Sequence, residues 1–147
     1  HKDHCGGARA FAGRVGAPIA GAGPHPVSRG KEGAPAFEEG ADLAYTPDEI
    51  LIDGARLSGG PWTIETVTTP GHLSNHLCFA LLEEATLFTG DHIMGWSTTV
   101  VAPPDGDMGD YLASLEKLLV RNDTRYLPTH GAPIEKPKPF VRAIRTH

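Results

Sequence analysis

The chain has few cysteines, no long apolar run and no run of basic residues. Two cysteines, Cys5 and Cys78, cannot build a disulfide framework and suit a reducing compartment. No apolar stretch approaches the ~20 residues that cross a bilayer, so we expect no membrane partner. A net charge of −5 without Lys/Arg runs argues against a nucleic-acid surface within this segment. These absences predict a cytoplasmic protein.

Glycine and proline are abundant, and they separate short apolar runs. The 18 glycines and 13 prolines fall between segments with strand or helix periodicity, which predicts a loop-rich α/β domain and not disorder. At this length the chain is one domain or part of one, and no boundary is visible within residues 1–147. Residues 22–47, rich in Gly, Pro and Glu, are expected to run over the surface as a long loop.

Two periodicities divide the rest of the chain into strands and helices. Short apolar, alternating or β-branched runs predict strands at 18–21, 50–53, 62–69, 77–82, 85–89 and 125–128. Apolar residues at helical spacing predict helices over 6–15 and 107–119, and the chain ends in a further helical pattern from Pro139. Only Glu83 and Glu84 stand between the fourth and fifth strands, so these two are expected to form an antiparallel hairpin.

Four short motifs place metal-ligand residues where strands give way to loops. They are His1-Lys2-Asp3-His4, Pro70-Gly71-His72, Thr89-Gly90-Asp91-His92 and Leu127-Pro128-Thr129-His130-Gly131. The first matches the end of an H-x-H-x-D-H motif whose leading histidine would precede this chain. In a turn just past a strand, residues two apart point the same way, so His1 and Asp3 are expected to face one metal pocket. His4 would then turn towards a second metal.

Together the four motifs resemble the metallo-β-lactamase superfamily of binuclear metal hydrolases. Residues 71–79 and 89–96 look most like its β-lactamase-like protein 2 branch, although Leu73 replaces the usual threonine or serine. The resemblance implies a four-layer αββα sandwich, of which this chain would be the later portion only. We therefore expect residues 1–147 to be a metallo-β-lactamase-like domain that is incomplete at the N-terminus.

The resemblance also implies how the metal ligands are shared between two sites. It assigns His1 and His72 to the first metal, Asp3, His4 and His130 to the second, and Asp91 to both as the bridge. Asp3 would in addition act as a catalytic residue that orients the nucleophile. In the di-iron redox branch of the family a glutamate normally stands at the position of His1. The best-known true β-lactamases have a cysteine or serine at the position of Asp91. Two zinc ions fit best, with manganese or iron as alternatives.

Three further residues near the motifs leave alternatives open. His76 and His92 either line the pocket, beside the ligands or against the substrate, or are ordinary surface histidines. Trp96 follows the bridging aspartate and is expected to form part of a substrate wall. Cys5 is expected to pack, and His25 and His147 to take no part.

The implied activity is hydrolysis of an ester, thioester or amide by zinc-bound hydroxide, with a small-molecule acyl compound as substrate. A metal-dependent nuclease or phosphodiesterase, with nucleic acid as partner, is the first alternative. The second alternative is a catalytically inactive metal-binding fragment. Exposed apolar strand faces in such a fragment would favour a homodimer.

Overall fold

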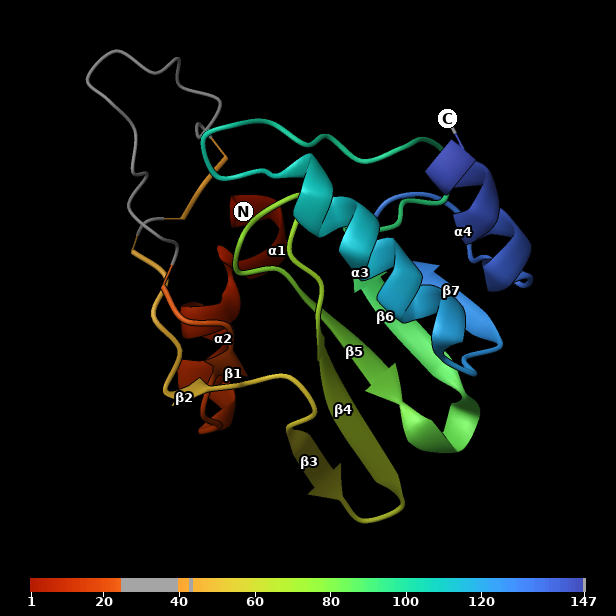
Figure 1. Ribbon diagram of the computed structural model, residues 1–147. Coiled ribbons are helices and arrows are strands. Elements are labelled where there is room, and N and C mark those ends of the chain that lie inside the picture. Colours follow the sequence, from red (N-terminus) through yellow and green to blue (C-terminus); the bar gives the residue numbers. More distant parts are fainter. Residues whose placement is uncertain (25–39, 43, 147) are drawn as a thin grey trace.

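The computed structural model describes residues 1–24, 40–42 and 44–146, which form an α/β arrangement around a five-stranded sheet (Figure 1). The strand order is β3 (Arg56–Gly59), β4 (Trp62–Thr68), β5 (Leu77–Leu81), β6 (Thr86–Gly90) and β7 (Arg125–Pro128). Neighbours from β3 to β6 are antiparallel, whereas β7 is parallel to β6. The α/β class and the predicted hairpin around Glu83 and Glu84 are confirmed. His25, His147 and most of the predicted loop at 22–47 lie outside the described residues.

Three local expectations need correction. Strand β3 was not predicted, because it has only four residues, which are half-exposed and mostly lack apolar side chains. It pairs with β4 across a turn in which Gly60 has a φ of +63°. The predicted strand at 50–53 is only β2 (Glu49–Ile50), since a turn follows at Asp53 and Gly54. The predicted helix over 6–15 is α2 (Ala8–Val15), and it is preceded by a short helix α1 (Lys2–Cys5) that was not expected.

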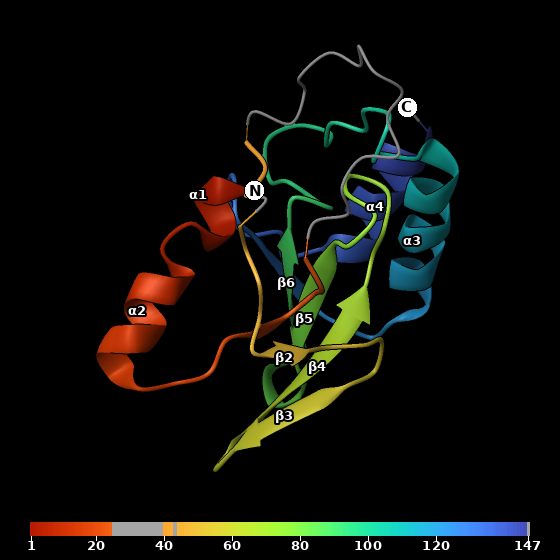
Figure 2. The same cartoon turned by 90° about the vertical axis from the view of Figure 1, so that its left-hand side faces the viewer.

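One face of the sheet carries the core. Helices α3 (Met108–Val120) and α4 (Pro137–Thr146) cover this face (Figure 2). Strand alternation directs one set of side chains towards these helices. The buried cluster consists of Val67, Cys78, Ala80, Leu87, Ile93, Tyr111, Leu115, Leu118, Tyr126, Ile134 and Val141. Tyr111, Leu115 and Leu118, at helical spacing in 107–119, belong to this cluster. Met108 and Leu112 are exposed, so the apolar pattern predicted for this helix is only partly core.

The other face of the sheet is covered by less structure. There β1 (Ala20–Gly21) pairs in parallel with β2, and α2 lies on the same side of the molecule (Figure 2). Phe79 and Phe88, which pair across β5 and β6, stay partly exposed on this face. The smaller sheet has two strands in the described residues, so the four-layer αββα sandwich stays a prediction. None of the described helices is long and apolar enough to span a bilayer.

Gly71 brings the loop after β4 directly onto the first turn of α3. Its φ is +138°, and a Cβ at this position would lie 2.4 Å from Tyr111 Cα. The Gly71 carbonyl also accepts a hydrogen bond from Asp107 N at 2.9 Å. Only glycine combines this backbone conformation with this close approach.

We expect Gly71→Ala to lower the free energy of unfolding by roughly 2–3 kcal/mol, because the methyl group collides with backbone that cannot move independently. Gly13→Ala is the matched control: Gly13 lies in α2 with nothing within 4 Å of an added Cβ. That change should raise stability by about 0.5–1 kcal/mol. Urea unfolding followed by circular dichroism measures both, and equal effects would contradict the packing argument.

The imidazole ring of His92 is buried without a polar partner among the described residues. Its ring centroid lies 4.9 Å from that of Tyr111, and neither ring nitrogen has a hydrogen-bond partner among the described residues. Burial lowers the pKa of His92 from 6.5 to about 3, and the nearby His72 contributes in the same direction. The folded protein therefore holds this ring neutral over a pH range in which the unfolded chain protonates it.

Between pH 6.5 and about 3 the unfolded state binds a proton that the folded state does not, so stability must fall as the pH falls. One such histidine contributes a slope of up to about 1.4 kcal/mol per pH unit. In metal-free protein, His92→Phe should flatten the decline of unfolding free energy with acidification. Urea titrations at several pH values test this, and parallel curves for the two proteins would show that His92 is not responsible.

Candidate metal centre

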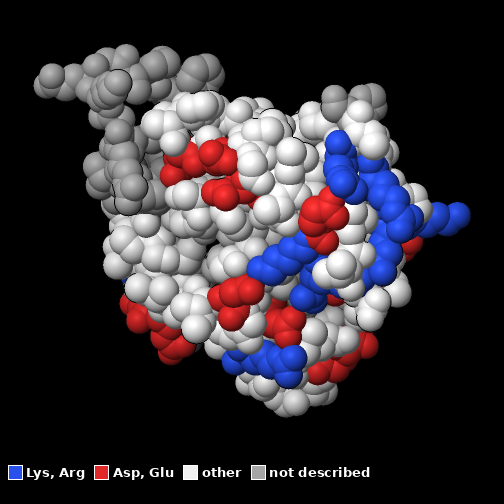
Figure 3. Space-filling model, in the orientation of Figure 1, with Lys and Arg blue, Asp and Glu red and all other residues white. Residues whose placement is uncertain are grey.

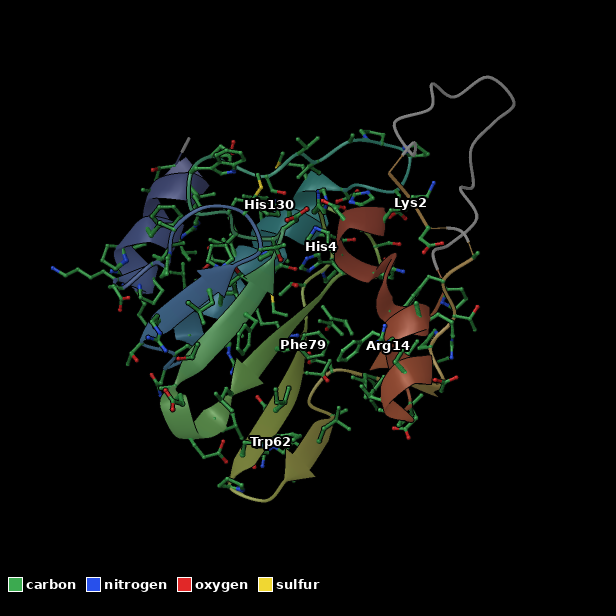
Figure 4. The ribbon with its side chains drawn as sticks, turned by 180° about the vertical axis from the view of Figure 1, so that it is seen from behind. Lys2, His4, Arg14, Trp62, Phe79 and His130 are labelled. Carbon is green, nitrogen blue, oxygen red and sulfur yellow. The ribbon has the colours of Figure 1, made fainter. Side chains whose placement is uncertain are left out.

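Six side chains from separate segments meet at one end of the large sheet. Figure 4 labels two of them, His4 and His130, close together at this end. His72, Asp91 and His130 follow β4, β6 and β7, whose carboxyl ends share one edge because these three strands run in the same direction. His1, Asp3 and His4 come from α1 and the residue before it. The sheet thus holds half of the cluster, and the N-terminal helix holds the other half against it.

The cluster divides into two groups that share Asp91. One group is His1, His72 and Asp91, and the other is Asp3, His4, Asp91 and His130; within each, potential ligand atoms lie within 4.8 Å of one another. Asp91 Oδ2 lies 3.0 Å from His4 Nε2 and 3.8 Å from His72 Nε2. Asp91 Oδ1 lies 3.6 Å from His130 Nε2. Among the residues that the structure describes, only the Asp91 carboxylate reaches both groups.

Two buried polar atoms of the cluster have no hydrogen-bond partner among the described residues. They are His72 Nε2 and Asp91 Oδ1. His72 Nδ1 lies 2.6 Å from the Val100 carbonyl oxygen, so it carries the proton, and Nε2 keeps a free lone pair. An imidazole held by a backbone carbonyl in this way has the tautomer that binds a metal. Because unpaired buried polar atoms are costly, the donor set fits a cation.

The pKa values of His4 and Asp91 are coupled. The hydrogen bond to Asp91 is the main cause that raises the pKa of His4, although burial opposes it. Burial alone would raise the pKa of Asp91, but the hydrogen bond from His4 and the neighbouring histidines lower it overall. Asp91 is therefore a carboxylate at neutral pH, which is the form that a metal ion requires.

The six predicted ligands are brought together, but the spacing argument for the first motif is wrong. Asp3 and His4 lie on the helical turn of α1 and share a group, whereas His1 belongs to the other group. Residues two apart would share a side only in extended backbone. Asp3 Oδ2 is 3.3 Å from His130 Nε2.

The three additional candidates have three different surroundings. His76 is partly buried and lines the pocket beside the cluster, where its Nε2 accepts a hydrogen bond from Asp91 N at 3.2 Å. His92 is buried behind Tyr111 and is not among the residues that line this pocket. Trp96 is 75% exposed and lies in a shallow groove against α4, with Phe140 and Ile144. Neither His92 nor Trp96 therefore lies where a pocket wall was expected.

A pocket of about 320 Å³ opens directly beside the cluster. His1, His4, His72 and Asp91 form one end of it. Its floor is the less covered face of the sheet, with Leu77, Phe79 and Phe88, and residues 20–22 lie over it. The sequence analysis did not identify these apolar residues, although alternation in 77–81 and 86–90 could have placed them opposite the core face. Cys5 also lines the pocket, and its thiol donates to the His1 carbonyl at 3.2 Å.

Residues 1–130 match the family model of the metallo-beta-lactamase superfamily. A beta-lactamase-like protein 2 homolog from Caenorhabditis elegans is 38% identical over 102 residues, which are 67% of this chain and 31% of the relative. An atrochrysone carboxyl ACP thioesterase from Aspergillus fumigatus is 39% identical over 94 residues, or 62% of this chain and 29% of that protein. The chain thus spans about a third of the length of these relatives. The first match confirms the predicted resemblance to the β-lactamase-like protein 2 branch.

Solved structures show the same fold. The BLEG-1 B3 metallo-beta-lactamase matches with a TM-score of 0.74 at 23% identity, covering 96% of this chain and 73% of that one. The protein TTHA1623, solved in a di-iron-bound form, matches with a TM-score of 0.67 at 26% identity, covering 93% of this chain and 72% of that one. With the family match over most of its length, the chain belongs to the metallo-beta-lactamase superfamily.

Proposed function

We propose that this chain carries the binuclear metal centre of a hydrolase that cleaves an ester, thioester or amide bond. The observation that carries the proposal is the pair of donor groups joined by Asp91, with unpaired buried lone pairs on Asp91 and His72. Zinc is the preferred ion for these His/Asp donors, and manganese or iron is the alternative. The di-iron form of TTHA1623 supports a two-metal centre of variable composition.

Two bound metal ions would lower the pKa of a shared water and polarise the bond that is cleaved. The chain's own residues have separable roles. Asp91 would fix the distance between the two donor groups, and the Val100 carbonyl holds His72 in one orientation. The Asp3 side chain is 58% exposed, and its Oδ2 lies 3.6 Å from His4 Nε2 and 3.3 Å from His130 Nε2. Asp3 is therefore the carboxylate best able to orient an attacking water and to accept its proton.

The pocket supports an acyl substrate. Its floor of leucine and phenylalanine side chains adjoins the donor groups, so an apolar acyl group could lie on the sheet with its carbonyl carbon at the cluster. The name of the Aspergillus fumigatus relative, a thioesterase, points to the same reaction class. Lys and Arg side chains gather over α3 and α4 (Figure 3), but Lys117, Arg121 and Arg145 are paired with carboxylates. A phosphodiester substrate therefore has less support.

The metal content per chain tests the centre itself. We expect close to two zinc ions per chain by elemental analysis after zinc loading and desalting. Asp91→Ala should release most of this metal, because both groups lose their shared ligand. Asp110→Ala removes an exposed carboxylate in the first turn of α3 and should leave the metal content unchanged. A wild-type protein that binds no zinc, iron or manganese would disprove the proposal.

Turnover of two substrate classes tests the reaction. With metal bound, we expect hydrolysis of short and medium acyl thioesters and little hydrolysis of bis(p-nitrophenyl) phosphate. Asp3→Asn should lower kcat for the thioester by about 100-fold, the scale of a lost proton acceptor, while Asp110→Asn should not. The opposite preference would favour the nuclease alternative. Bound metal without either activity would favour the inactive metal-binding alternative.

A further inference from the structure

His76 contacts the backbone of the bridging aspartate without belonging to either donor group. Its Nε2 lies 3.2 Å from Asp91 N, and its Nδ1 lies 2.8 Å from Thr69 Oγ1. Gly90, with a φ of +53°, lets the imidazole lie directly against the end of β6, since a Cβ there would be 2.7 Å from His76 Nε2. The close fit of Gly90 and His76 shows that the end of β6 is shaped around this ring.

The hydrogen bonds of His76 form a directed chain. Because Asp91 N–H donates to Nε2, that nitrogen is unprotonated, and the ring hydrogen is on Nδ1 and donates to Thr69 Oγ1. The Thr69 hydroxyl is then free to donate to Cys78 Sγ at 3.2 Å, and the Cys78 thiol points to the Thr89 carbonyl at 3.5 Å. This series of hydrogen bonds begins at Asp91 N and ends at the carbonyl of Thr89, two residues earlier in the sequence.

The surroundings keep this direction fixed. Thr69 and Cys78 are fully buried, and burial raises the pKa of the Cys78 thiol to about 12, so it stays a donor. The Asp91 N–H already occupies Nε2 of His76, so this ring can donate only through Nδ1. Each member of the chain therefore has one available direction of donation.

We propose that His76 is a positioning residue: its hydrogen bond to Asp91 N holds the backbone where the Asp91 carboxylate reaches both donor groups. This inference rests on the proposed metal centre. His76 takes no metal itself, and its contribution reaches the metal through the main chain. A rotation of the Asp91 backbone would move Oδ1 away from His130 or Oδ2 away from His72, and the two groups would lose their common ligand.

Three substitutions at position 76 separate this role from packing. The end of a glutamine side chain comes close to the position of Nε2, so His76→Gln keeps an acceptor for Asp91 N. The end of an asparagine side chain corresponds to Nδ1, so His76→Asn keeps only the contact with Thr69, and His76→Phe keeps neither. We expect Phe and Asn to weaken zinc binding by about 10–100-fold, the scale for lost partners of metal ligands. The Gln variant should stay within a few-fold of wild type.

Zinc affinity is measured by competition with a chromophoric chelator, and the Co²⁺ absorption spectrum reports the geometry around the metal. His92→Phe is the matched control, because His92 is also adjacent to Asp91 but makes no hydrogen bond through its ring. Its zinc affinity and Co²⁺ spectrum should equal those of wild type. The Asn and Phe variants should show altered Co²⁺ spectra even at saturating metal.

Unchanged zinc affinity in the Asn and Phe variants would overturn the inference while leaving the metal centre intact. The inference would also be overturned if all three variants lost zinc affinity equally and in proportion to the stability of the metal-free proteins. A packing role alone produces that pattern. If the Phe variant does not fold, the Gln and Asn pair decides, together with Thr69→Val, which removes the partner of Nδ1 and should weaken zinc binding several-fold. Absence of metal in wild type would instead be a failure of the proposed function.

Discussion

The shared carboxylate of Asp91 is the constraint on which the site depends. Of the described side chains, it alone lies within reach of both donor groups. It follows β6, whose carboxyl end lies at the same end of the sheet as those of β4 and β7. The sheet supports this position because β7 pairs with β6 as far as Gly90 and Pro128, with one register shift between Phe88 and Gly90. A strand end is fixed by its neighbours, whereas a free loop is not, so a ligand placed directly after a strand is positioned at little additional entropic cost.

The two faces of the sheet have different surroundings: one packs against helices and the other borders the pocket. One face is sealed by α3 and α4, and most of the buried apolar residues lie there. The other face stays partly open and forms the floor of the pocket beside the two candidate donor groups. Gly71 links the two sides: its backbone rests on α3, and the next residue is a predicted ligand. Close packing of Gly71 against α3 on the core face thus determines the position of His72 at the end of the sheet.

The positions of His72, Asp91 and His130 could be predicted from sequence because each follows a strand pattern, and strand ends are where side chains can converge. His1, Asp3 and His4 were assigned only through the family resemblance of the first motif. Helix α1 could not be predicted, since His1 to Cys5 carry no apolar periodicity and their helical turn depends on contacts such as Lys2 N to the Gly40 carbonyl. The family resemblance assigns Asp3 and His4 to the same metal, and the helical turn of α1 is what places them in one group. Strand β3 could not be predicted because the strand is short and its sequence has no apolar alternation, so its pairing with β4 is what defines it.

The histidines show why residue type alone could not assign roles. His4, His76 and His92 lie within one end of the fold, yet a carboxylate partner raises the pKa of the first, and burial lowers the pKa of the other two to about 3. A ring beside a carboxylate is suited to bind or exchange a cation, whereas a ring kept neutral offers fixed donor and acceptor atoms. His76 uses both of its atoms and His92 uses neither. Which of these roles a histidine takes is decided by its partners. Asp91 is 87 residues from His4, and Thr69 is 7 residues from His76, and residue type alone reveals neither partner.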